Sequence, residues 1–155
     1  MKILFVCLGN ICRSPLAEGI LKDKLKRNNL PFEVDSAGFE DFHAGDGADR
    51  RSIEIARIHG IDITDHIARR FVPEDFDIYD RIYVMDSVNY SDVISIARNK
   101  EDLKKVDFVM NMVEPGKNRS VPDPYYGGHD GFMKIFKMLD LACEEIIEDI
   151  KRKNK

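Results

Sequence analysis

Two side chains near the N-terminus have the types and the spacing needed to bind and attack a tetrahedral anion. Cys7 lies six positions before Arg13, in the segment Cys-Leu-Gly-Asn-Ile-Cys-Arg. Such a loop at a helix N-terminus presents several backbone N–H groups to one oxyanion, and the planar guanidinium of Arg13 binds two of its oxygens. The same positive groups favour the nucleophilic thiolate form of Cys7. We therefore expect residues 7–14 to bind a phosphate group or its mimic, and the sulfur of Cys7 to be the nucleophile.

A thiolate that attacks a phosphoester of a phenol also needs an acid to protonate the leaving group. Asp123 is the strongest candidate, because Pro122 and Pro124 restrict the backbone on both sides of it. Tyr125 and Tyr126 follow directly and are candidates for an aromatic wall of a substrate cleft. Considered alone, Asp-Pro is ordinary turn chemistry and the tyrosines are ordinary surface residues, so these assignments depend on the cysteine loop.

The elements that must position these groups alternate between strands and helices. Ser14 and Pro15 are typical of an N-cap and a first helical turn, and the apolar spacing that follows predicts a helix to about residue 28. We expect strands at 2–6, 32–38, 81–85 and 107–111, a connector at 71–76, and helices at 51–59, 89–97 and 132–151. This alternation predicts a mostly parallel sheet covered on both faces, with ligands beyond the carboxyl ends of the strands.

Composition and charge exclude several classes of protein. The 155 residues are 43% hydrophobic and include only three cysteines, an odd number that argues against a disulfide scaffold. A formal net charge of −4 disfavours nonspecific binding to nucleic acid or to an acidic membrane surface, and no apolar run is long enough to cross a membrane. The four histidines show no metal-ligand spacing. We expect a cytoplasmic protein, a monomer or weak dimer, that needs no metal or cofactor.

The cysteine loop and Asp123-Pro-Tyr together resemble the low-molecular-weight protein tyrosine phosphatases. Further matching segments follow in the expected order, namely Asp35-Ser-Ala-Gly38, Asp49-Arg-Arg51, His66-Ile-Ala-Arg-Arg70 and Met85-Asp86. The resemblance spans nearly the whole chain and implies one phosphatase domain over residues 1–155. We therefore expect a three-layer, doubly wound α/β domain with a central four-stranded parallel sheet in the flavodoxin-like order 2-1-3-4.

The resemblance also implies a role for each matching residue. Cys7 would be the nucleophile that becomes a phosphocysteine, Arg13 would bind the phosphate, and Asp123 would act first as general acid and then as the base that activates water. Cys12 would pair with Cys7 on oxidation, while Cys143 is expected in the core. The remaining candidates form a phosphate-binding loop (Leu8, Gly9, Asn10, Ile11, Cys12, Arg13 and Ser14), its support (Ser36 and His66) and a substrate cleft (Phe42, Tyr125 and Tyr126).

Other functions on the same loop remain open at the level of sequence. Relatives directed to phosphoarginine tend to carry Thr where this chain has Ile11, which favours an aromatic phosphoester. A thiol-dependent arsenate reductase shares the fold and the loop but requires further cysteines to relay electrons. A catalytically silent phosphoprotein-binding module would retain Arg13 and lose Cys7 or Asp123. We expect a metal-independent phosphatase that hydrolyses phosphotyrosine in proteins.

Overall fold

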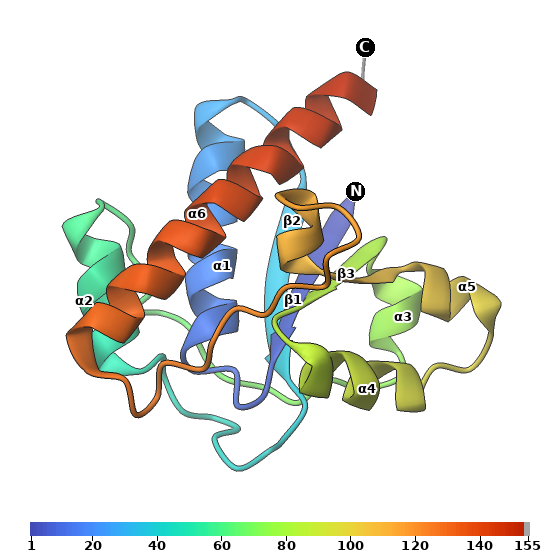
Figure 1. Cartoon of the computed structure of the whole chain (residues 1–155), viewed down its shortest axis with the longest axis horizontal. Helices are drawn as coiled ribbons and strands as arrows, with labels where there is room; N and C mark the ends of the chain where they lie inside the picture. The colour runs from blue at the N-terminus through green and yellow to red at the C-terminus, as the bar shows by residue number, and fades with distance from the viewer. Residues whose placement is uncertain (154–155) are drawn as a thin grey trace.

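The computed structural model describes residues 1–153, and a parallel β-sheet forms its central layer (Figure 1). The strands are β1 (Lys2–Cys7), β2 (Glu33–Gly38), β3 (Arg81–Val84) and β4 (Val106–Phe108). They are hydrogen-bonded in the order β2-β1-β3-β4, which confirms the order expected from the sequence. Because β1 has a neighbour on each edge and helices on both faces, its sequence is a continuous apolar run rather than an alternating one.

Helices cover both faces of the sheet, so the domain has three layers (Figure 1). One face carries α1 (Arg13–Arg27), α2 (Arg50–Ile58) and α6 (Gly128–Lys153), and the other carries α3 (Asp75–Ile78), α4 (Ser87–Ser95) and α5 (Lys100–Lys104). Side chains of β1 alternate between two core clusters, with Phe5 and Cys7 in the first and Leu4 and Val6 in the second. Cys7 therefore points to the face covered by α1.

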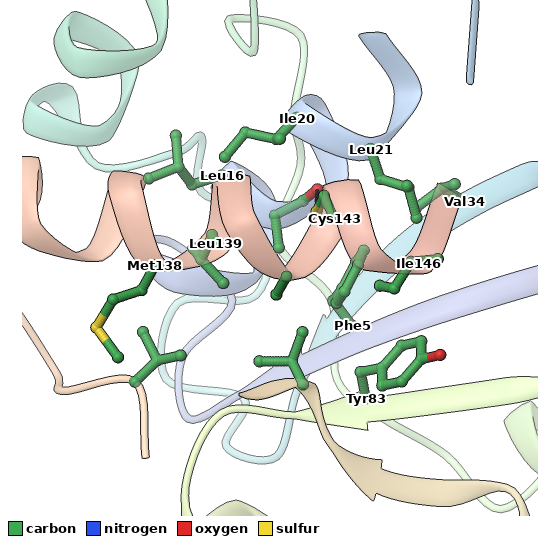
Figure 2. Packing of buried hydrophobic residues seen from close by; sticks show 14 of the residues in the cluster. Phe5, Leu16, Ile20, Leu21, Val34, Tyr83, Met138, Leu139, Cys143 and Ile146 are labelled. Carbon is green, nitrogen blue, oxygen red and sulfur yellow. Dashed lines mark hydrogen bonds between the residues drawn. The ribbon is translucent and has the colours of Figure 1, made fainter. Parts of the chain in front are cut away.

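The larger core cluster lies between the sheet, α1 and α6 (Figure 2). Leu16 and Ile20 of α1 pack with Leu139 and Cys143 of α6 above Phe5 of the sheet. Cys143 has no exposed surface, which confirms its expected place in the core. Burial raises the pKa of its thiol, so this cysteine is a neutral packing residue.

No helix among residues 1–153, α6 included, is long and apolar enough to span a membrane.

The helix that follows β1 begins differently from the prediction. Ser14 is not the N-cap, because α1 begins at Arg13 and its N-cap is Cys12, which makes no side-chain capping bond. The Ser14 hydroxyl instead contacts the side chains of Cys7 and Asn10, so it is committed to the loop rather than to the helix backbone. The interpretation of Ser14 as a helix cap was therefore wrong.

Other elements also differ from the sequence expectation. Helix α5 was missed because its five residues carry no apolar periodicity; the Asn99 side chain caps it by accepting from the Asp102 N–H. The predicted connector at 71–76 runs into the one-turn helix α3, and the last predicted strand ends at Phe108, where a 3₁₀ turn begins. Helix α6 starts four residues before Phe132, in a polar turn that a hydrophobic pattern does not detect.

Candidate active site

A cleft of about 250 Å³ opens at the carboxyl end of β1, where the sequence placed the site. Its lining contains ten of the residues singled out from the sequence, together with Glu40 and His43, which were not. The ten are Cys7, Leu8, Gly9, Ile11, Cys12, Arg13, Phe42, Asp123, Tyr125 and Tyr126. The other four candidates, Asn10, Ser14, Ser36 and His66, contact one another or the loop from behind it. Residues 116 positions apart in the chain thus share one cleft, because their loops meet at the same edge of the sheet.

The Cys7 sulfur lies at the floor of the cleft, where hydrogen-bond donors surround it. Its side chain is buried, and Sγ lies 2.9 Å from the Ser14 Oγ and 3.3 Å from the backbone N of Asn10. Helix α1 begins at Arg13, so the positive end of its dipole lies beside the sulfur. These contacts stabilise a negative charge on sulfur and on any anion bound above it.

Asn10 is the centre of the network that shapes the loop. Its backbone has a φ of 57°, in the left-handed region. Its amide nitrogen donates to the hydroxyls of Ser14 (2.8 Å) and Ser36 (2.9 Å), while its side-chain oxygen accepts from the backbone N–H of Arg69 (3.0 Å). Its backbone carbonyl accepts from Nε2 of His66 at 2.7 Å. Because Ser14 accepts from Asn10, its own hydrogen is available to the Cys7 sulfur.

Glu18 completes this network, and sequence reasoning gave it no role. Its carboxylate accepts from the Ser36 hydroxyl at 2.6 Å and lies 4.0 Å from Nδ1 of His66. The direction of each hydrogen bond in the network is therefore set: the Ser36 hydroxyl donates to Glu18, and the Ser14 hydroxyl donates to the Cys7 sulfur. The position of Glu18 one turn along α1 from Ser14 is the sequence signal that places it near the loop.

Gly38, the last residue of β2, lets the strand lie directly against the phosphate-binding loop. A Cβ at this position would lie 2.9 Å from three backbone atoms of the loop: the nitrogen of Asn10, the carbonyl carbon of Gly9 and the oxygen of Leu8. Atoms of the backbone cannot move aside without changing the loop, so any larger residue would reshape it.

Arg13 is buried and held by two acceptors. Its Nη1 donates to Oδ2 of Asp86 (2.7 Å) and to the carbonyl of Val121 (2.9 Å). Burial alone would lower the pKa of Arg13, but the Cys7 sulfur and the Asp86 carboxylate raise it overall. The guanidinium is therefore charged and fixed in orientation. The sequence predicts no individual role for Asp86; its position two residues after the carboxyl end of β3 is the signal for one.

The Asp123 carboxyl lies between the cleft and solvent. Its side chain is 48% exposed, and Oδ2 lies 3.9 Å from Nη2 of Arg13. Oδ1 accepts from the backbone N–H of Tyr125 at 3.0 Å, which holds the carboxyl in an Asx turn. A group in this position can exchange a proton with water and reach an atom bound above the Cys7 sulfur.

Three aromatic side chains stand at the rim of the cleft. Phe42 is 82% exposed and Tyr126 is 96% exposed, whereas Tyr125 is 38% exposed. The tyrosine rings pack edge to face with centroids 5.0 Å apart, and Phe42 packs in the same manner against His43 at 4.9 Å. These rings leave apolar surface open at the mouth of a site whose floor is polar.

Cys12 lines the same cleft as Cys7. Burial raises the pKa of the Cys12 thiol, and the nearby Asp49 carboxylate raises it further. Cys7 and Cys12 are both free thiols in this structure. No cluster of three or more His, Cys, Asp or Glu side chains suited to a metal ion occurs in the described part of the chain.

Comparison with known proteins gives consistent results at the levels of family, sequence and structure. Residues 2–155 match a family model described as low molecular weight phosphotyrosine protein phosphatase. The chain is 38% identical over 153 residues to the protein of that name from Schizosaccharomyces pombe, covering 97% of each chain. Its structure superposes with a TM-score of 0.92 on a protein tyrosine phosphatase from Entamoeba histolytica with Hepes in its active site, at 36% identity and covering 100% and 99% of the two chains. A Drosophila arginine phosphatase superposes with a TM-score of 0.90 at 31% identity, covering 97% and 98%.

Proposed function

Because the chain belongs to the low molecular weight phosphotyrosine protein phosphatase family, we propose that Cys7, Arg13 and Asp123 carry out phosphotyrosine hydrolysis within one phosphatase domain formed by residues 1–155. The observation that supports this most strongly is the place of the Cys7 sulfur at the floor of the cleft, 2.9 Å from the Ser14 hydroxyl, with the other two side chains on the cleft wall. The protein is accordingly a hydrolase of phosphoric monoesters.

In the first step, the Cys7 thiolate attacks the phosphorus atom in line with the tyrosine oxygen. The loop N–H groups and Arg13 bind the non-bridging oxygens, where negative charge must be held in the transition state. A phenolate is a poor leaving group, since its conjugate acid has a pKa of about 10. The Asp123 carboxyl therefore donates its proton to that oxygen as the P–O bond breaks, and the products are tyrosine and a phosphocysteine.

In the second step, the same carboxyl, now ionised, takes a proton from water. The water oxygen attacks the phosphocysteine, the P–S bond breaks, and inorganic phosphate leaves with the Cys7 thiolate restored. The partial exposure of Asp123 supports both halves of this cycle, because a water molecule reaches it without a conformational change. Arg13 keeps its orientation throughout, since Asp86 and Val121 hold its Nη1.

The proposed substrate is a phosphotyrosine-containing protein, with phosphoarginine as the alternative. The exposed rings of Phe42 and Tyr126 support an aromatic substrate group, and Ile11 lines the cleft without offering a polar contact. Phosphoarginine is retained as the alternative substrate because a Drosophila arginine phosphatase has the same fold at 31% identity. An internal thiol relay of the arsenate reductase type is disfavoured, because Cys143 is fully buried in the core, away from the cleft.

The test is a substrate panel run on three matched proteins. We expect the wild-type chain to hydrolyse a phosphotyrosine peptide faster than phosphoserine or phosphoarginine peptides, and to leave arsenate unreduced. Cys7→Ser should abolish turnover, whereas Cys143→Ser, a control thiol outside the cleft, should retain it. Near-normal activity in Cys7→Ser would contradict the mechanism, and preference for phosphoarginine would contradict the substrate assignment alone.

A further inference from the structure

We propose that Arg51 is a positioning residue that holds the loop carrying Asp123 in place for proton transfer to the leaving group. The inference rests on the general-acid role proposed above for Asp123. Arg51 lies in the first turn of α2, where its side chain joins that helix to the loop formed by residues 122–126. None of its atoms lines the cleft, so its effect on the reaction passes through the loop.

The guanidinium of Arg51 is fixed on several sides. Nε and Nη2 donate to the two carboxylate oxygens of Asp49, each at 3.0 Å, which is a two-point pairing. Its Cζ atom lies 4.6 Å from the centroid of the buried Phe132 ring and 5.3 Å from that of the Tyr125 ring. The remaining nitrogen, Nη1, donates to the backbone carbonyl of Tyr125 at 2.7 Å. An arginine held by a carboxylate and two rings is a rigid donor.

The loop that carries Asp123 depends on this contact. Within residues 1–153, one turn bond joins the Gly127 N–H to the Pro124 carbonyl at 2.8 Å, and the bond from Arg51 to the Tyr125 carbonyl is the only hydrogen bond that ties residues 122–126 to a segment distant in the chain. The Tyr125 N–H in turn donates to Oδ1 of Asp123, so one residue connects the arginine to the acid. The other tie is the ion-pair contact between Asp123 and Arg13, at 3.9 Å, which is too long for a hydrogen bond.

The same turn of α2 is also fastened to the phosphate-binding loop. The backbone N–H of Asp49 donates to the carbonyl of Ile11 at 2.8 Å, and the Ser52 hydroxyl donates to the carbonyl of Cys12 at 3.1 Å. Through these contacts, Arg51 fixes the position of the Asp123 carboxyl relative to the loop that binds the phosphate. Because a displacement of the proton donor by about 1 Å can lower the reaction rate by up to about 10²-fold, this fixed position affects the rate directly.

The inference predicts a defect that depends on the leaving group. Arg51→Met removes the donor while retaining a chain of similar length, and we expect it to lower kcat/KM for phenyl phosphate about tenfold. For dinitrophenyl phosphate, whose leaving group departs without protonation, kcat/KM should change less than about twofold. The inhibition constant of inorganic phosphate should also change less than about twofold, since the phosphate-binding loop is untouched.

The matched control is Arg50→Met, one residue earlier on the same helix, where the arginine is exposed and pairs with no acid within residues 1–153. It should behave as wild type with both substrates. Should Arg51→Met fail to fold, Arg51→Lys provides the same comparison, because lysine keeps the charge but lacks the planar fork that bonds Asp49 and Tyr125 together.

A double substitution separates this inference from the proposed function. In an Asp123→Ala background, adding Arg51→Met should cause little further loss with phenyl phosphate, because the group that Arg51 positions is already gone. An equal loss with both substrates, or a full additional loss in the Asp123→Ala background, would overturn the positioning role and leave the function of Asp123 intact. If Asp123→Ala itself lacked a leaving-group-dependent defect, the general-acid assignment would fail instead.

Discussion

Asn10→Ala is the substitution whose cost can be worked out most completely from the structure. The side chain makes two buried hydrogen bonds, to Ser14 and Ser36, and a partly buried one from the backbone N–H of Arg69, while its backbone has a φ of 57°. Alanine cannot replace any of these bonds and is less tolerant of a positive φ than asparagine. The substitution therefore removes two separable contributions to stability.

Each lost hydrogen bond costs about 1 kcal/mol, and holding alanine instead of asparagine at a positive φ costs about 1 kcal/mol more. Their sum is about 4 kcal/mol, a large part of the roughly 5–15 kcal/mol by which domains are stable. In a domain of this size the melting temperature should fall by roughly 8–16 °C. Phosphate should also bind more weakly, because the hydrogen of Ser14 is no longer directed toward the Cys7 sulfur.

The assay is urea unfolding of the wild type, Asn10→Ala and Asn29→Ala. Asn29 is a matched control, because it has a φ of 54° but is exposed and makes no side-chain hydrogen bond among residues 1–153. Asn29→Ala should lower the free energy of unfolding by only about 1 kcal/mol, the cost of the backbone conformation. If the two variants were equally stable, the hydrogen bonds of Asn10 would contribute nothing and the reasoning about the loop would be refuted.

Three further substitutions test separate parts of the site and the fold. Gly38→Ala should cost about 1–3 kcal/mol in urea unfolding and abolish phosphate binding, because its Cβ meets three backbone atoms of the loop; unchanged phosphate affinity would contradict this. Asp86→Ala should raise the inhibition constant of phosphate about tenfold by releasing the Arg13 Nη1, and a normal constant would show that this orientation is unimportant. Burial is the larger cause, and the Asp35 carboxylate the next, of the rise in the pKa of Tyr79 from 10.0 to about 12. The protonated Tyr79 hydroxyl therefore stabilises the folded protein below pH 10, and this stabilisation is lost as the pH rises to about 12. Tyr79→Phe should flatten that part of the stability profile, measured by urea unfolding at several pH values, and an unchanged slope would refute the shift.

Local signals in the sequence were sufficient to predict the order of the strands and to select most of the residues that line the cleft. The apolar run of β1, the spacing of Cys7 and Arg13, and the proline-flanked Asp123 are all short-range patterns. The rule that ligands bind at the carboxyl ends of parallel strands then places these distant residues at one edge. That rule needs only the order of elements, which alternation supplies.

Contacts between side chains on different elements were beyond such patterns. Glu18 and Asp86 are two of many carboxylates in the chain, and only the packed structure shows that Glu18 contacts Ser36 and that Asp86 contacts Arg13. Ser14 was misread because a hydroxyl before a proline has the same local sequence whether it caps a helix or contacts a sulfur. Arg51 was noted only as part of a matching segment, since its partner Tyr125 lies 74 positions away.

The most direct test of the central claim is to identify the atom that carries the phosphoryl group during turnover. The Asp123→Ala variant should be mixed with dinitrophenyl phosphate, quenched within milliseconds and digested for mass spectrometry. This substrate forms the phosphocysteine without an acid, and the absence of the base in this variant slows hydrolysis of the phosphocysteine. The mechanism predicts one phosphoryl group on the peptide that contains residues 7–13, located on Cys7, and none in Cys7→Ser. A phosphoryl group on Cys12, on another residue or on no residue at all would contradict it.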